Sequence, residues 1–184
     1  MKPYFPVVGV FGVLLIAFSA ALLVPLCLSW WLHDGAESAY DEAFLLTFGS
    51  GLGLWWSARR ERAELKVRDG FLMVVLVWTV LPVFACLPFI LHIGISFTDA
   101  YFEAVSGLTT TGSTVIPNLD KLPASINFWR GFLVWLGGMG LIVLAVAVLP
   151  LLGIGGRQMF KAEAPGPMKE SSLTPRMAET AKGL

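Results

Sequence analysis

The sequence predicts an all-α integral membrane protein with four transmembrane helices, one re-entrant pore helix and an extended filter loop. Composition is the first reason: 56% of the residues are hydrophobic, only 14% are charged, and the mean hydropathy is +0.73. Such a surface suits lipid or other helices better than water. The second reason is an uncharged run from Phe5 to Leu32. The third is a much shorter apolar segment, Thr98–Leu108, which directly precedes a threonine-rich loop.

Two helices are expected before that loop. Phe5–Leu32 is too long for the apolar core of a signal peptide, and no A-x-A-like cleavage site follows it, so we expect a retained helix. An acidic linker is expected over Asp34–Glu42, and a second, shorter crossing over Ala43–Ser57. The second crossing carries Gly49 and Gly53 in G-x-x-x-G spacing, which indicates either a specific docking face or a helix that simply needs small residues.

Basic residues predict the orientation. They gather in the second loop and again after the last apolar segment: Arg59, Arg60, Arg62, Lys66 and Arg68, then Arg157, Lys161, Lys169, Arg176 and Lys182. Because cytoplasmic loops carry an excess of Lys and Arg, we expect the N-terminus and the C-terminal tail in the cytoplasm. A third helix is then expected over Phe71–Leu91, bent by Pro82 and Pro88, and a fourth over Asn127–Leu152.

The chain is therefore expected to have four parts. They are a two-helix transmembrane hairpin (1–58), a basic cytoplasmic loop (59–69), a helix, pore loop, helix unit (70–152) and a cytoplasmic connector (153–184).

The segment around Gly112 is the feature that the other helices are expected to hold. Thr98–Leu108 can form a helix capped by Ser96 or Thr98, but it spans only about 15 Å, roughly half of a bilayer core. It can therefore enter the membrane without crossing it. Thr109–Val115 is rich in β-branched residues, which favour extended backbone, and Gly112 can adopt dihedral angles that they resist. Extended backbone at membrane depth must be buried in protein or line a water-filled path, where its carbonyl groups are available to a cation.

Several motifs in and after this loop carry a resemblance to a known family. They are Thr109-Thr110-Thr111-Gly112-Ser113-Thr114 with Pro117, Trp129-Arg130-Gly131, Gly137-Gly138-Met139-Gly140, Ala162-Glu163-Ala164-Pro165-Gly166-Pro167 and Thr174-Pro175-Arg176. Together they resemble the first pore repeat of the Trk/Ktr family of bacterial potassium transporters, most closely its Trk pore subunit. The resemblance covers the whole chain, because that family also carries two extra helices before its first repeat.

This resemblance implies a function and a site. The chain would take part in potassium uptake across the bacterial inner membrane and supply one quarter of a selectivity filter, with K⁺ as the transported ion and no organic cofactor. The ion-facing backbone carbonyls would belong to Thr110, Thr111, Gly112 and Ser113. The filter of potassium channels usually reads T-V-G-Y-G, and the missing Tyr and second Gly imply a simpler and shorter filter here.

The resemblance also implies partners. The chain would be a fragment whose remaining pore repeats follow in the same protein. The whole subunit would form a homodimer in membrane lipid and bind TrkA, a cytoplasmic nucleotide-binding regulatory subunit.

Three groups of residues keep two interpretations each. Glu103 either attracts cations or pairs with Arg130 at the outer mouth, or else is a hydrated residue early in the pore helix. Gly137, Gly138 and Gly140 either form a gating hinge or let the fourth helix pack closely on the pore helix. For Thr109–Thr114 the alternative to a filter is an exposed loop outside the membrane.

Other functions remain as alternatives to the transporter fragment. The chain could be the complete subunit of a homotetrameric cation channel, since one loop cannot close a ring around an ion. It could also be a membrane scaffold without transport. An enzyme is not expected, because no nucleophile with a nearby base and no metal-ligand cluster stands out. No nucleic acid partner is expected either, since the formal net charge is zero and no basic run with interleaved aromatic residues is present.

Overall fold

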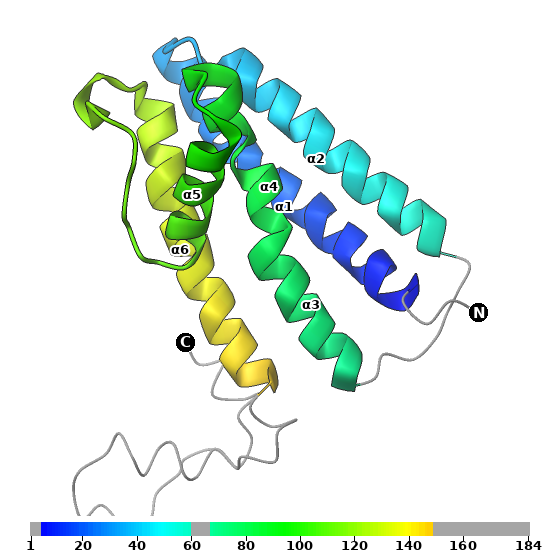
Figure 1. The fold of residues 1–184 in the computed structure, drawn as a ribbon. Helices are drawn as coiled ribbons and strands as arrows, with labels where there is room; N and C mark the ends of the chain where they lie inside the picture. The colour runs from blue at the N-terminus through cyan, green and yellow to red at the C-terminus, as the bar shows by residue number, and fades with distance from the viewer. Residues whose placement is uncertain (1–4, 60–66, 149–184) are drawn as a thin grey trace, which may run out of the picture. The chain divides into compact units, whose positions relative to one another are not determined.

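The computed structural model describes residues 5–59 and 67–148, and within these ranges the regular structure is helical, without strands. In chain order the elements are α1 (Phe5–Leu32), α2 (Glu37–Ala58), α3 (Val67–Thr79), α4 (Leu81–Ala85), the π-helical turn η1 (Phe89–Ile93), α5 (Phe97–Leu108), the 3-10 turn η2 (Leu119–Lys121) and α6 (Ala124–Val148) (Figure 1). The chain separates into two compact units, Met1–Gly138 and Met139–Leu184. Of the second unit, the structure describes only the last turns of α6.

Two segments of the described chain are long and apolar enough to cross a membrane. They are Val7–Leu32, which is most of α1, and Arg68–Ile93, which joins α3, α4 and η1. They coincide with the first and third predicted crossings. The first predicted helix, Phe5–Leu32, has the same bounds as α1.

α1 and α2 lie side by side and antiparallel, and glycine allows their close approach (Figure 1). A Cβ built on Gly12 would lie 2.6 Å from the main-chain nitrogen of Trp55, and one on Gly51 would lie 2.9 Å from the Gly12 carbonyl oxygen. Gly49 and Gly53 have no atom of the described chain within 4 Å of such a Cβ. The close contact with α1 is therefore made by Gly51 and not by the G-x-x-x-G pair. Residues two positions apart lie on nearly opposite sides of a helix, so Gly49 and Gly53 face away from α1 when Gly51 faces it.

α2 begins earlier than expected. It starts at Glu37 rather than Ala43, so most of the predicted acidic linker Asp34–Glu42 is helical. The prediction was wrong because the acidic residues were read as a loop signal, whereas negative charge is favourable in the first turns of a helix. The acidic segment is thus the polar end of a longer helix.

Asp34 joins the turn between α1 and α2 to the start of α6. Its carboxylate accepts hydrogen bonds from the Ser29 hydroxyl, from the Ala36 N–H at 3.3 Å and from the Ser125 N–H at 2.9 Å. Burial acts to raise the pKa of Asp34, but these hydrogen bonds outweigh it and hold the pKa below its usual value. Asp34 is therefore ionised, and its carboxylate holds the N-terminus of α6 through the Ser125 N–H.

The third predicted helix, Phe71–Leu91, is broken into three pieces, as its prolines indicated. Pro82 lies in the first turn of α4 and Pro88 immediately precedes η1. The helix starts earlier, at Val67, so the end of the predicted basic loop 59–69 is helical. Residues 60–66 of that loop lie outside the described residues.

Distant side chains satisfy a main-chain carbonyl near each break. The Tyr101 hydroxyl donates to the Thr79 carbonyl at 2.9 Å, and the Trp129 indole N–H donates to the Ala85 carbonyl at 3.0 Å. Trp129 is among the largest fully buried side chains of the described core. The bond to the Ala85 carbonyl is buried, where a carbonyl without a partner would be costly, so Trp129 stabilises the broken helix at that point. The bond to the Thr79 carbonyl is exposed and joins the end of α3 to α5.

α5 matches the expected half-length helix. It runs from Phe97 to Leu108, and the Ser96 hydroxyl caps it by accepting from the Asp99 N–H at 3.1 Å, while donating to the Asp99 carboxylate at 2.7 Å. The Ser96 hydroxyl is thus the N-cap of α5, and the Asp99 carboxylate orients that hydroxyl. The predicted helix and one of its two predicted caps are confirmed.

α6 begins at Ala124, slightly before the predicted Asn127. The Asn127 side-chain amide donates to the Leu119 carbonyl at 2.7 Å and holds the preceding 3-10 turn against the helix. The predicted end of this crossing, Leu152, and the connector 153–184 lie outside the described residues.

Candidate functional site

The loop after α5 starts with a hydrogen-bonded cap of that helix. The Thr110 N–H donates to the Gly107 carbonyl at 2.8 Å, and the Thr111 N–H donates to the Ser106 carbonyl at 2.9 Å. Thr110 has φ +58°, in the left-handed region. These three features define a Schellman motif, which ends a helix and satisfies its last carbonyls. The chain therefore leaves α5 sharply at Thr110.

Three residues between α5 and η2 have positive φ, namely Thr110, Gly112 and Asn118, and the first two lie in the segment 109–116. Gly112 has φ +73°, as expected for the position predicted to need unrestricted backbone. The positive φ of Thr110 was not predicted, because β-branched residues strongly disfavour this conformation. A left-handed conformation at a residue other than glycine costs about 1–3 kcal/mol. It persists where the surrounding structure enforces it, often at ligand sites.

The main-chain groups of the loop are divided unequally between donors and acceptors. The N–H groups of Thr110, Thr111 and Gly112 all donate to the last carbonyls of α5, the Gly112 bond to Ser106 measuring 3.3 Å. Within the described chain, no donor reaches the carbonyls of these three residues. The Ser113 carbonyl differs, because it accepts the Ser106 hydroxyl at 2.6 Å and keeps one lone pair. Carbonyl oxygen is thus the group that this loop leaves available.

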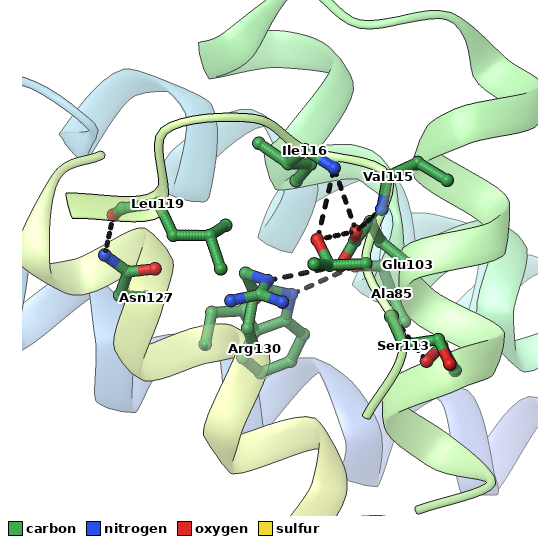
Figure 2. A network of polar contacts seen from close by, with 11 residues as sticks. Ala85, Glu103, Ser113, Val115, Ile116, Leu119, Asn127 and Arg130 are labelled. Atoms are coloured by element: carbon green, nitrogen blue, oxygen red, sulfur yellow. Dashed lines mark hydrogen bonds and ion pairs between the residues drawn. The ribbon is translucent and has the colours of Figure 1, made fainter. Parts of the chain in front are cut away.

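The second part of the loop is held by Glu103, from the middle of α5 (Figure 2). One carboxylate oxygen, Oε1, accepts from the Thr114 hydroxyl, the Val115 N–H at 2.7 Å and the Ile116 N–H at 3.4 Å. The other, Oε2, accepts from Arg130 Nε of α6 at 3.1 Å. One carboxylate therefore connects α5, the loop that follows it and α6.

Both members of this ion pair are largely removed from solvent. The Glu103 side chain is 3% exposed and the Arg130 side chain is 19% exposed. Of the interpretations of Glu103, the structure supports pairing with Arg130, and the hydrated alternative is wrong. A buried carboxylate is tolerated when a positive charge and hydrogen bonds compensate it, and Glu103 has both.

α5 and α6 approach closely at two glycines. A Cβ on Gly137 would lie 1.9 Å from the Leu108 carbonyl oxygen, and one on Gly107 would lie 2.9 Å from Leu133 Cβ. No side chain fits at Gly137 unless the backbone moves. The packing interpretation of the glycine cluster 137–140 is therefore supported at Gly137, and the hinge interpretation stays a prediction.

Sequence reasoning gave Ser106 no role, although it makes three bonds to the loop. Its carbonyl accepts from Thr111 and Gly112, and its hydroxyl donates to Ser113. The only available signal was a hydroxyl in the last turns of a short apolar helix, where such residues often bond to nearby backbone.

Comparisons with known proteins place the chain in a family. The family described as "TrkH: Cation transport protein" matches residues 37–184. The Trk system potassium uptake protein TrkH of Escherichia coli (strain K12) is 50% identical over 175 residues, which cover 94% of this chain and 36% of that protein. TrkH of Vibrio parahaemolyticus is 51% identical over 180 residues, covering 97% and 37%. TrkG of Escherichia coli (strain K12) is 39% identical over 175 residues, covering 94% and 36%.

A solved structure shows the same fold. The crystal structure of the potassium transporter TrkH from Vibrio parahaemolyticus superposes with a TM-score of 0.80 at 46% sequence identity, covering 100% of this chain and 36% of that one. The chain thus spans only about a third of the length of these relatives. The match includes α5, the loop and α6, and this chain belongs to the TrkH family of cation transport proteins, a family of transporters and not of enzymes.

Proposed function

We propose that this chain supplies one quarter of a potassium selectivity filter in a Trk-type potassium uptake protein. The observation that carries the proposal is the division of main-chain groups in the loop. The N–H groups of Thr110, Thr111 and Gly112 are used by α5, while no donor in the described chain reaches their carbonyls. These carbonyls and that of Ser113 are proposed as the potassium ligands.

The chemistry of a partly dehydrated cation supports this assignment. A cation entering a medium of low dielectric constant loses hydration worth tens of kcal/mol and needs replacement oxygens. Carbonyl dipoles supply them without the full charge of a carboxylate, so the ion can also leave. The C-terminus of α5 adds a favourable partial negative charge, worth up to about 1 kcal/mol or more where water is scarce.

We further propose four membrane crossings: α1, α2, the broken helix from α3 to η1, and α6, with α5 as a re-entrant helix. Exposed tryptophans support this arrangement at the ends of the first two, since Trp30 and Trp31 end α1 and Trp55 and Trp56 end α2. At the second pair, the Arg59 guanidinium lies 3.7 Å from the centre of the Trp56 ring, as suits a basic residue at the cytoplasmic interface. The N-terminus and the tail would then be cytoplasmic.

The rest of the assembly is proposed from the relatives, which are potassium uptake proteins of the Trk system about three times as long. The remaining pore repeats of the same protein would complete the ring of carbonyls. The full-length subunit would lie as a homodimer in the lipid of the bacterial inner membrane and bind the cytoplasmic regulatory subunit TrkA.

The replacement Gly112→Ser tests the filter assignment in the complete protein. A Cβ at Gly112 meets no atom within 4 Å, so the substitution acts through the backbone, whose φ of +73° disfavours any side chain. This conformation costs an L-residue about 1–2 kcal/mol, so we expect potassium-over-sodium selectivity of uptake to fall about tenfold.

The matched control is Gly131→Ser, on α6, where a Cβ also meets nothing within 4 Å but φ is not positive. Its selectivity should equal that of the wild type. Unchanged selectivity in both variants, measured as K⁺ and Na⁺ uptake by cells without other potassium transport, would refute the filter assignment.

A further inference from the structure

Glu103 is not available to a passing ion. Its two oxygens receive bonds from three groups of the loop and from Arg130, which nearly fills the roughly four acceptor sites of a carboxylate. Its charge is paired, and its side chain is 3% exposed. Direct attraction or ligation of potassium by this carboxylate is therefore disfavoured. The geometry instead indicates that Glu103 holds the loop through its hydrogen bonds.

The groups that Glu103 holds follow the proposed ligands directly in the chain. Val115 and Ile116 donate through their main-chain N–H groups, and Thr114 donates through its hydroxyl. The Thr114 oxygen also accepts the Ile116 N–H at 3.1 Å, so the contact is a small network and not a single bond (Figure 2). Hydrogen bonds to an ionised carboxylate are about twice as strong as neutral ones.

Arg130 has a separate part in this arrangement. In the described chain it reaches the loop only through Glu103, with its Nε on the oxygen that the loop does not use. It thereby compensates the charge of the carboxylate and fixes its rotation, so that Oε1 faces the loop. The Glu103 carboxylate lies between the loop and Arg130 of α6, so it links the position of the loop to that of α6.

From these contacts we infer that Glu103, oriented by Arg130, is a positioning residue that determines ion selectivity by fixing the end of the loop that follows the ligand carbonyls. This inference rests on the proposed function. A ring of carbonyls discriminates potassium from sodium only while the carbonyls keep their spacing. The near end of the loop is fixed by the cap of α5, and Glu103 fixes the far end.

Two substitutions in the complete protein test this role. Glu103→Gln keeps an acceptor for the loop but loses the negative charge, and its amide N–H group faces the Arg130 guanidinium. Because neutral bonds are about half as strong, we expect potassium-over-sodium selectivity to fall about fivefold. Glu103→Leu removes every acceptor, and its selectivity should fall further than that of Glu103→Gln.

The control is Asp120→Asn, which removes an exposed negative charge from the 3-10 turn of the same outer loop. If Glu103 worked by attracting cations, Glu103→Gln and Asp120→Asn would both raise KM for K⁺ and Na⁺ alike, most strongly at low ionic strength, and leave selectivity unchanged. Positioning predicts altered selectivity in the Glu103 variants and none in Asp120→Asn.

The readouts are the ratio of K⁺ to Na⁺ uptake and the amount of folded protein. If Glu103→Leu fails to accumulate, Glu103→Gln still decides, because it keeps the size and an acceptor of the original side chain. Reduced uptake at unchanged selectivity in Glu103→Gln would overturn the inference. If Gly112→Ser alters selectivity in the same assay and Glu103→Gln does not, the filter assignment stands and only the role of Glu103 falls.

Discussion

The two halves of the loop that follows α5, residues 109–116, are held by different kinds of interaction. The near half, 109–112, is fixed by main-chain bonds to the last turn of α5, at the Ser106 and Gly107 carbonyls among others. The far half, 113–116, is fixed by side chains, namely the Ser106 hydroxyl and the Glu103 carboxylate with Arg130 behind it. One half is therefore an extension of a helix, and the other is a tertiary contact.

This difference shows where tolerance to substitution should lie. Main-chain bonds in the near half survive most side-chain changes and fail only when the backbone conformation or its support is altered. In the far half, the bonds depend on particular side chains, some of them distant in sequence. Backbone changes should therefore affect the near half most, and polar-to-apolar changes the far half.

The largest effect on stability is expected at Gly137, where α6 packs against the end of α5 from which the near half extends. In Gly137→Ala the new Cβ would lie 1.9 Å from the Leu108 carbonyl oxygen, at the last residue of α5. Either α6 or the end of α5 must move, and we expect a loss of about 3 kcal/mol in the free energy of unfolding, the upper range for overpacking. Thermal unfolding of the complete protein in detergent measures it.

Gly131→Ala is the control, because its Cβ meets nothing within 4 Å. Alanine is the better helix former, so this variant should be unchanged or more stable by up to about 1 kcal/mol. Equal melting temperatures for the two variants would contradict the close approach of α5 and α6.

Intermediate effects are expected at Thr110 and Gly112, the two positive-φ positions of residues 109–116, and the effects at these two positions should have opposite signs. Thr110→Gly relieves a conformation that costs about 1–2 kcal/mol, against a loss of about 0.5–1 kcal/mol in unfolded-chain entropy, so we expect a gain of up to about 1 kcal/mol. Gly112→Ala should lose about 1–2 kcal/mol for the converse reason. The same melting experiment compares them, and destabilisation of both to a similar degree would exclude the left-handed conformation of Thr110.

The smallest effect is expected from Ser106→Ala, which separates the two halves. The Ser106 carbonyl and its bonds to the near half remain, while the hydroxyl bond to Ser113 is lost. A hydrogen bond contributes about 1 kcal/mol, and alanine recovers about half of that in helix propensity, so the net loss should be about 0.5 kcal/mol. Hydrogen exchange should accelerate at Val115 and Ile116 and stay unchanged at Thr111. Faster exchange across the whole loop would show that the halves are not held separately.

The helix pattern of this unit could largely be predicted from the sequence. The bounds of α1, the half-length of α5, its Ser96 cap and the break at Pro82 and Pro88 all follow from local composition and from the lack of an N–H in proline. The early start of α2 at Glu37 was missed because acidic residues occur both in loops and in first helical turns.

The sequence by itself determined which segments are helices, where the loop between α5 and α6 begins and that Gly112 adopts positive φ, because each depends on residues within a few positions of one another. Only the tertiary structure decided that Glu103 pairs with Arg130, that Trp129 satisfies the Ala85 carbonyl and that Thr110 also has positive φ. The two contacts join elements far apart in the chain, and the conformation of Thr110 opposes its own preference. Packing against α6 and the demand that buried polar groups find partners decide such features, and no local pattern encodes them.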